Sequence, residues 1–221
     1  MKLEEAKQKL DRLVGIPFCE LFSPADLQTI ILNKGKTGQL LELALGMRLS
    51  NTNLDFENGE LKTNKCDIDG TPLETVFITQ IASMIDELLQ CRPFEQTHLY
   101  SKIHNILYVP VFKGRGNIVP PENWMFLQPI HVELESTRFA QLNALWAQDY
   151  ASICIQLINQ IEQGEDSMIH TVNGIHLQIR TKDSKPYTPI YSRKYERVIS
   201  DKDRAFYFQK QFVYDIQKMS R

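Results

Sequence analysis

Apolar residues recur at helical spacing in several parts of the chain. Near its start, Leu3, Ala6 and Leu10 lie three or four positions apart, which predicts an amphipathic helix. Ser23 followed by Pro24 is typical of a helix start, because serine caps free amides and proline tolerates the first turn. We expect helices over residues 2–15, 36–46, 81–90, 136–163 and 205–219, with a further helix starting near residue 23.

Between these helices the pattern shortens to strand-like runs broken by turn residues. Asn58-Gly59 is a strong turn signal, because both residue types accept the positive φ of tight hairpins. The run 105–112 is apolar almost throughout, which predicts a strand that is buried on both faces. Strands are expected near residues 53–56, 60–66, 73–79, 105–112, 168–172 and 175–180. The alternation of helices and strands predicts a mixed α/β fold.

Composition narrows the class of protein. The chain has 221 residues, 43% hydrophobic and 24% charged, which excludes a disordered or fibrous chain. No apolar run reaches the roughly 20 residues of a membrane-spanning helix, so no membrane association is expected. The acidic N-terminal residues do not resemble a secretory signal, and the four cysteines are widely spaced without a C-x-x-C pair. A cytoplasmic protein with reduced thiols is therefore expected.

Charge is distributed unevenly along the chain. The formal net charge is −2, but residues 180–221 carry 11 Lys+Arg against 5 Asp+Glu, a balance of +6. The same segment contains five of the eight tyrosines. Basic residues interleaved with aromatic ones suit a nucleic acid, because cations meet phosphates while rings pack on bases or sugars. The alternative is a solvated basic face of a structural subdomain.

One short motif carries candidate chemistry. Glu60 and Lys62 are two apart on a predicted strand and so share a face, while Leu61 points to the core. The preceding turn can bring Asp55 alongside Glu60, and two converging carboxylates suit Mg²⁺, which keeps several waters and seeks a substrate phosphate. A lysine beside the metal can orient or deprotonate a water that attacks a phosphodiester. An E-x-K triplet also occurs by chance as solvated strand residues.

These residues belong to longer runs that together resemble the MutH endonuclease family. That family contains the strand-nicking enzyme of methyl-directed mismatch repair and related type II restriction enzymes that cut at GATC. The matching runs follow one another from residue 34 to residue 212. They are residues 34–42, Asp55, 59–63, 72–77, 95–98, 101–103, 109–111, 176–180 and 205–212.

The resemblance implies a restriction-endonuclease-like PD-(D/E)xK core with a metal-dependent centre formed by Asp55, Glu60 and Lys62. Glu42 matches an additional acidic residue supplied from a helix, which would be a further metal ligand. Lys102 matches a lysine that serves catalysis or phosphate contact. The alternative for Glu42 is a solvated glutamate on a helix, and the alternative for Lys102 is a surface lysine. The implied cofactor is Mg²⁺, with Mn²⁺ able to substitute.

The same resemblance implies contacts with double-stranded DNA. Lys34 and Gly35 match the place where the family approaches the DNA backbone, which a glycine permits closely. Arg180 matches a basic residue at the edge of the DNA-reading lobe, where a guanidinium suits guanine or phosphate. Tyr207 matches an aromatic position near the adenine methyl group, with a buried core tyrosine as the competing interpretation. Further candidate contacts on the basic segment are Lys182, Lys185 and Lys210.

Two features depart from the family pattern. Asp55 precedes Glu60 by five positions, two fewer than expected in the mismatch-repair branch, so Glu57 is the alternative first ligand. The residues that follow Arg180 also diverge, and these form the loops expected to read base edges. Both departures favour a type II restriction enzyme over a mismatch-repair nickase.

We therefore predict a Mg²⁺-dependent, sequence-specific DNA endonuclease, a type II restriction enzyme that cuts at or near GATC. It would form one MutH-like domain, with a catalytic lobe over about residues 1–130 and a helical, basic DNA-reading lobe over about residues 131–221. A restriction enzyme would cut both strands alone, as a homodimer on a palindromic site or by two successive nicks. The alternatives are a mismatch-repair nickase activated by a MutL-type partner and a catalytically silent DNA-binding module.

Overall fold

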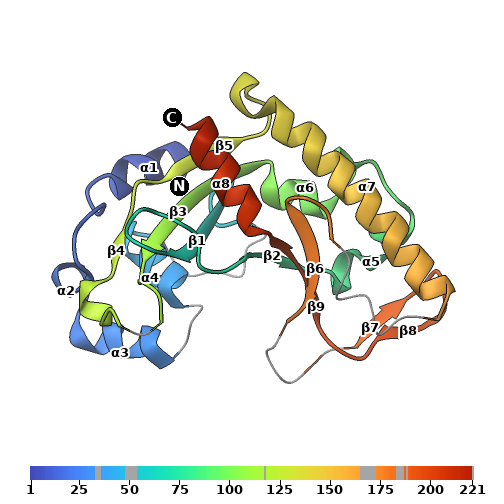
Figure 1. Cartoon of the computed structure of the whole chain (residues 1–221), viewed down its shortest axis with the longest axis horizontal. Coiled ribbons are helices and arrows are strands. Elements are labelled where there is room, and N and C mark those ends of the chain that lie inside the picture. The colour runs from blue at the N-terminus through green and yellow to red at the C-terminus, as the bar shows by residue number, and fades with distance from the viewer. Residues whose placement is uncertain are drawn as a thin grey trace. The chain divides into compact units, whose positions relative to one another are not determined.

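The computed structural model describes residues 1–32, 36–47, 54–116, 118–164, 173–182, 187 and 189–220. The chain forms two compact units, and each is assembled from separate stretches of sequence (Figure 1). The first unit comprises Met1–Thr75, Asn105–Glu133 and Val213–Arg221, and the second comprises Val76–His104 and Leu134–Phe212. The predicted division into a catalytic lobe and a DNA-reading lobe concerns function and stays a prediction.

The first unit is built on a four-stranded mixed sheet. Strand β1 (Glu60–Cys66) pairs in parallel with β3 (Asn105–Phe112), with Glu60 opposite Ile106. Strands β4 (Met125–Phe126) and β5 (Ile130–Glu133) pair antiparallel with β3. Seven of the eight β3 residues are buried, which confirms the predicted strand.

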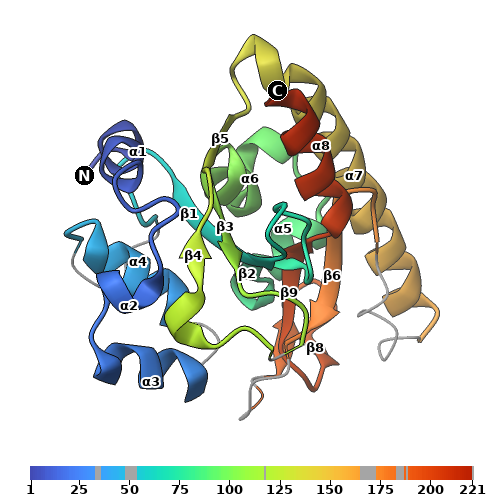
Figure 2. The same ribbon diagram turned by 60° about the vertical axis from the view of Figure 1, so that its left-hand side comes forward.

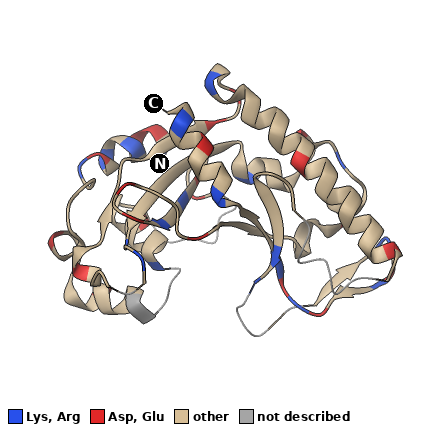
Figure 3. Ribbon diagram, viewed as in Figure 1, with Lys and Arg blue, Asp and Glu red and all other residues tan. Residues whose placement is uncertain are grey.

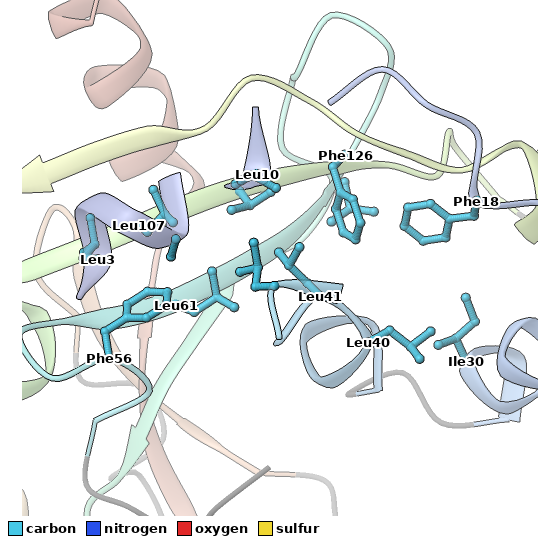
Figure 4. Close-up of a cluster of buried hydrophobic side chains, with 14 of the residues drawn as sticks. Leu3, Leu10, Phe18, Ile30, Leu40, Leu41, Phe56, Leu61, Leu107 and Phe126 are labelled. Atoms are coloured by element: carbon cyan, nitrogen blue, oxygen red, sulfur yellow. The ribbon is translucent and has the colours of Figure 1, made fainter. Parts of the chain in front are cut away.

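Helices on the first unit supply the rest of its core. They are α1 (Leu3–Leu10), α2 (Phe18–Leu21), α3 (Pro24–Leu32), α4 (Lys36–Ala44), the short 3-10 helix η3 (Pro121–Asn123) and the C-terminal part of α8 (Lys210–Met219). Helices α1 to α4 lie together beside the sheet (Figure 2). Leu41 of α4 packs in one apolar cluster with Leu61 of β1 and Leu107 of β3 (Figure 4). Leu61 therefore lies on the face of the sheet that packs against the helices. Because side chains alternate along a strand, Glu60 and Lys62 lie on the opposite face.

The second unit contains a three-stranded antiparallel sheet in the order β2 (Val76–Gln80), β9 (Arg204–Phe208), β6 (Leu177–Thr181). A separate hairpin is formed by β7 (Ile190–Ser192) and β8 (Arg197–Ser200). The helical elements are η1 (Ala82–Met84), α5 (Ile85–Leu89), η2 (Phe94–Gln96), α6 (His98–Ile103), η4 (Thr137–Phe139) and the long α7 (Ala140–Glu162).

Helix α7 anchors this sheet through aromatic and acidic side chains. The ring of Trp146 lies 5.0 Å from that of Phe208 on β9. The buried carboxylate of Asp149 accepts the amides of Ile175, His176 and Leu177 at 2.7, 2.6 and 2.9 Å, so it fixes the start of β6. Every helix among the described residues is either too short or too polar to span a membrane.

Several predicted elements differ from the structure. The N-terminal helix ends at Leu10 rather than near residue 15. Residues 54–56 form bends rather than a strand, and residues 168–172 lie outside the described part of the chain. The predicted helix over 205–219 was wrong at its start, because 204–208 form β9. Backbone pairing with β2 on one side and with β6 on the other makes these residues the central strand of the sheet.

Candidate active site

The start of β1 brings two carboxylates together. The backbone amide of Asp55 donates to Oε2 of Glu60 at 3.3 Å, and the amide of Leu61 donates to Oδ2 of Asp55 at 2.9 Å. Residues 54–58 form a bend, not the predicted strand, and this bend still places Asp55 beside the start of β1. Glu57, the alternative ligand, is exposed and accepts from the amino group of Met1 at 2.8 Å, which lowers its pKa. Asp55 is the acid that lies beside Glu60.

Lys62 lies on the same face of β1 as Glu60, as the spacing predicted. Its Nζ donates to Oε1 of Glu60 at 3.0 Å. The two side chains are only 10% and 4% exposed, respectively. Separating a buried pair of opposite charges is costly, because each charge would be left without a partner away from water. The pair therefore keeps one geometry. The ammonium group is thus fixed next to the carboxylates.

Helix α4 directs a third carboxylate toward this pair. Leu40, Leu41 and Leu45 bury the apolar side of the helix, and Glu42 lies off that side, half-buried. Burial and then the charges of Asp55 and Glu60 raise the pKa of Glu42 to about 7, while Lys62 opposes the rise. Three acids from two segments are therefore close enough to repel one another.

These residues fit a divalent cation, although they do not form a closed cage. No group of three or more His, Cys, Asp or Glu side chains gathers around a common metal position among the described residues. Mg²⁺ needs only one or two carboxylates, since waters and substrate phosphate complete its coordination. The donors are hard oxygens. Burial and, after it, the charges of Asp55 and Glu60 raise the pKa of Glu42, and a cation would offset the part that comes from those charges.

The other predicted site residues are distributed over the chain. Lys102 is half-buried on α6 and belongs to the second unit, whereas Asp55, Glu60, Lys62 and Glu42 belong to the first. Lys210 is exposed at the first position of α8. Three predicted DNA contacts lie outside the described residues, namely Lys34, Gly35 and Lys185.

The second unit carries a surface of rings and cations, which we call the aromatic–basic surface and define as Phe77, Tyr207, Arg180 and Lys182. Phe77 and Tyr207 are paired across β2 and β9, and their rings make an edge contact at 5.5 Å. The guanidinium of Arg180 lies 5.6 Å from the centre of the Tyr207 ring, and Nζ of Lys182 lies 5.8 Å from that of Phe77. Basic positions occur along β6 and around the β7–β8 hairpin (Figure 3).

Tyr207 lies outside the core, and its place near DNA stays a prediction. Its neighbours Phe206 and Phe208 fill the core, so the Tyr207 ring lies on the opposite, outer face of the sheet. Phe77 is 40% exposed and was missed in the sequence. Phe77 lies between two apolar residues, so the sequence does not show which side chains of this strand face outward. Only the pairing of the strands shows that Phe77 lies exposed beside Tyr207 and Lys182.

Comparison with known proteins gives a consistent family. The model of the family described as DNA mismatch repair enzyme MutH matches residues 47–144. The protein named DNA mismatch repair protein MutH from Vibrio cholerae is 29% identical, over 96% of this chain and 94% of its own. Proteins of the same name from Actinobacillus pleuropneumoniae and Klebsiella pneumoniae are 30% and 31% identical, over 96% and 93% of this chain and 92% and 81% of their own. The resemblance read from the motifs is confirmed, and the chain belongs to the MutH family.

Proposed function

We propose that this protein is a divalent-metal-dependent DNA endonuclease that nicks one strand during mismatch repair. The convergence of Asp55, Glu60 and Lys62 at the start of β1 is the observation that carries the proposal. Relatives over almost the full chain are named mismatch repair proteins, which favours this role over the type II restriction enzyme that the divergent loops suggested.

The residues of the site have distinct proposed roles. Asp55 and Glu60 would hold Mg²⁺, with Glu42 as a third ligand or as the group that orients a water, and Mn²⁺ would substitute. When bound, the cation would polarise the scissile phosphate and lower the pKa of a bound water. Lys62, held by Glu60, would orient the attacking water and stabilise the charge that develops on the phosphate. In-line attack would leave a 5′-phosphate and a 3′-hydroxyl.

The aromatic–basic surface is the proposed DNA contact of the second unit. Arg180 and Lys182 would meet phosphates or guanine, and Tyr207 and Phe77 present ring faces or edges to base methyl groups. Lys102 and Lys210 are proposed additional contacts to phosphate. GATC is the leading candidate site, and the core is proposed to be of the PD-(D/E)xK type.

A catalytically silent DNA-binding module is less consistent with the site. A binding module gains nothing from keeping Glu42, Asp55 and Glu60 close together, because like charges repel both one another and DNA. The same arrangement is useful where a cation has to be held. A catalytic role explains why the acids remain together.

A plasmid assay tests the proposal. Purified protein with Mg²⁺ should act weakly on supercoiled GATC plasmid and should produce nicked circles rapidly when a MutL-type protein is added. The Glu60→Gln variant should do neither. Linear products from the protein alone would instead support a restriction enzyme, acting as a homodimer or by two nicks. DNA binding without cleavage under all conditions would support the silent module.

A further inference from the structure

A chain of hydrogen bonds connects β5 and β3 to the turn that precedes β1. Asn105, the first residue of β3, donates from Nδ2 to the carbonyl oxygen of Asn58 at 2.6 Å. Its Oδ1 lies 2.7 Å from Nε2 of His131 on β5. Because the Asn105 oxygen can only accept, His131 donates from Nε2, which assigns the tautomer of the neutral ring.

The other side of the same turn is held by helix α1. Oδ1 of Asn58 accepts the backbone amide of Leu3 at 2.9 Å, and its Nδ2 donates to the carboxylate of Glu4 at 3.2 Å. Asn58 thus uses its carbonyl oxygen and both ends of its side chain at once. Helix α1 and strand β3 thus both form hydrogen bonds to the turn.

Gly59 shows how closely the turn is pressed against these neighbours. A Cβ atom placed on Gly59 would lie 2.7 Å from the backbone oxygen of Asn105 and 2.8 Å from Cδ1 of Leu3. Real Cβ atoms essentially never come this close, and because the Asn105 oxygen belongs to the backbone, a side chain here would force the backbone to shift. The backbone between the two carboxylates therefore has little freedom to shift while Asn105 stays in place.

We infer that Asn105 and His131 are positioning residues for the two carboxylates at the start of β1. His131 orients the amide of Asn105, and Asn105 holds the carbonyl of Asn58. The turn thereby fixes the separation of Asp55 and Glu60, the two residues that would hold a cation. The inference rests on the proposed function, since the positioning matters only where the carboxylates act together. Groups behind a metal ligand typically change metal affinity or activity by about 10–100-fold when they are lost.

A set of substitutions tests this inference. Asn105→Leu removes both hydrogen bonds while keeping the branch at Cγ, His131→Leu removes the donor, and His131→Gln keeps an N–H donor. Single-turnover nicking of a GATC duplex is measured against Mg²⁺ concentration, and hydrogen exchange is measured by mass spectrometry over residues 54–62. Leu10→Ala is the control, because it destabilises the core of the same unit and touches none of these bonds.

Asn105→Leu and His131→Leu should lower the saturating rate by about 10–100-fold, raise the Mg²⁺ midpoint and speed exchange over 54–62 in the metal-free protein. His131→Gln should stay within about threefold of the wild type. Leu10→Ala should lose stability without moving the Mg²⁺ midpoint. If Asn105→Leu leaves rate, midpoint and exchange unchanged while Glu60→Gln abolishes nicking, the inference is wrong and the proposed function stands. If Glu60→Gln nicks normally, both are overturned.

Discussion

Glu42→Gln removes a charge from the crowded carboxylates without changing the shape of the side chain. In the folded metal-free protein the pKa of Glu42 rises from 4.5 to about 7, through burial and then through Asp55 and Glu60. Between these pH values the folded state holds a proton that the unfolded chain has released. The contribution of Glu42 to stability should therefore fall as pH rises through this window and stay lowered above it.

The magnitude follows from the same numbers. A rise from 4.5 to about 7 corresponds to about 3 kcal/mol at full strength. Glu42 is only half-buried, so solvent screening reduces this to roughly 1–2 kcal/mol. For a chain of this size, that energy corresponds to about 2–8 °C in melting temperature.

The assay is calorimetric unfolding in EDTA at pH 4.5 and pH 8.5. Glu42→Gln should melt above the wild type at pH 8.5, and the difference should shrink at pH 4.5. Adding Mg²⁺ at pH 8.5 should raise the melting temperature of the wild type more than that of the variant. Glu122→Gln, at an exposed position of η3, is the matched control and should show no pH-dependent difference. Equal differences at both pH values would show that the charge of Glu42 does not destabilise the folded protein.

Three further substitutions test other parts of the structure. Gly59→Ala should displace the turn between the carboxylates and lower nicking by at least about 10-fold in a kinetic assay, while DNA affinity is retained. Arg180→Ala should weaken DNA binding and reduce the slope of log affinity against log salt by about one, which titrations at several salt concentrations would measure. Asp149→Ala leaves three amides at the start of β6 without their acceptor and should cost at least about 3 kcal/mol in urea unfolding, and a loss below 1 kcal/mol would contradict this.

The part of the site that lies on β1 could be predicted because it is local. Glu60, Leu61 and Lys62 alternate on one strand, so their faces follow from spacing alone, and the turn signal at residues 58–59 placed Asp55 nearby. Glu42 required the family resemblance, since only the packing of α4 shows that it faces the acids. The bonds of Asn105 and His131 could not be predicted, because they join positions 26 and 47 residues apart.

The predicted elements agree with the structure where the hydrophobic periodicity is strong. The prediction fails where the same residues fit both a helix and a strand. Strand β3 and helix α7 were predicted close to their observed bounds. Residues 204–208 are aromatic-rich and adjoin a true helix, so the helical pattern was extended too far. Pairing with β2 and β6 on both sides makes them a strand. The chain also leaves and re-enters each compact unit, which depends on long-range pairing that spacing does not reveal.

If Glu60 and Lys62 act in cleavage, their loss should abolish nicking while DNA binding is retained. Single-turnover nicking of a GATC duplex is measured with Mg²⁺ for the wild type, Glu60→Gln and Lys62→Met, and the affinity of each for the same duplex is measured in EDTA. Both variants should lose nicking by at least about 1,000-fold while affinity changes by less than about threefold. Nicking by either variant at the wild-type rate would contradict it.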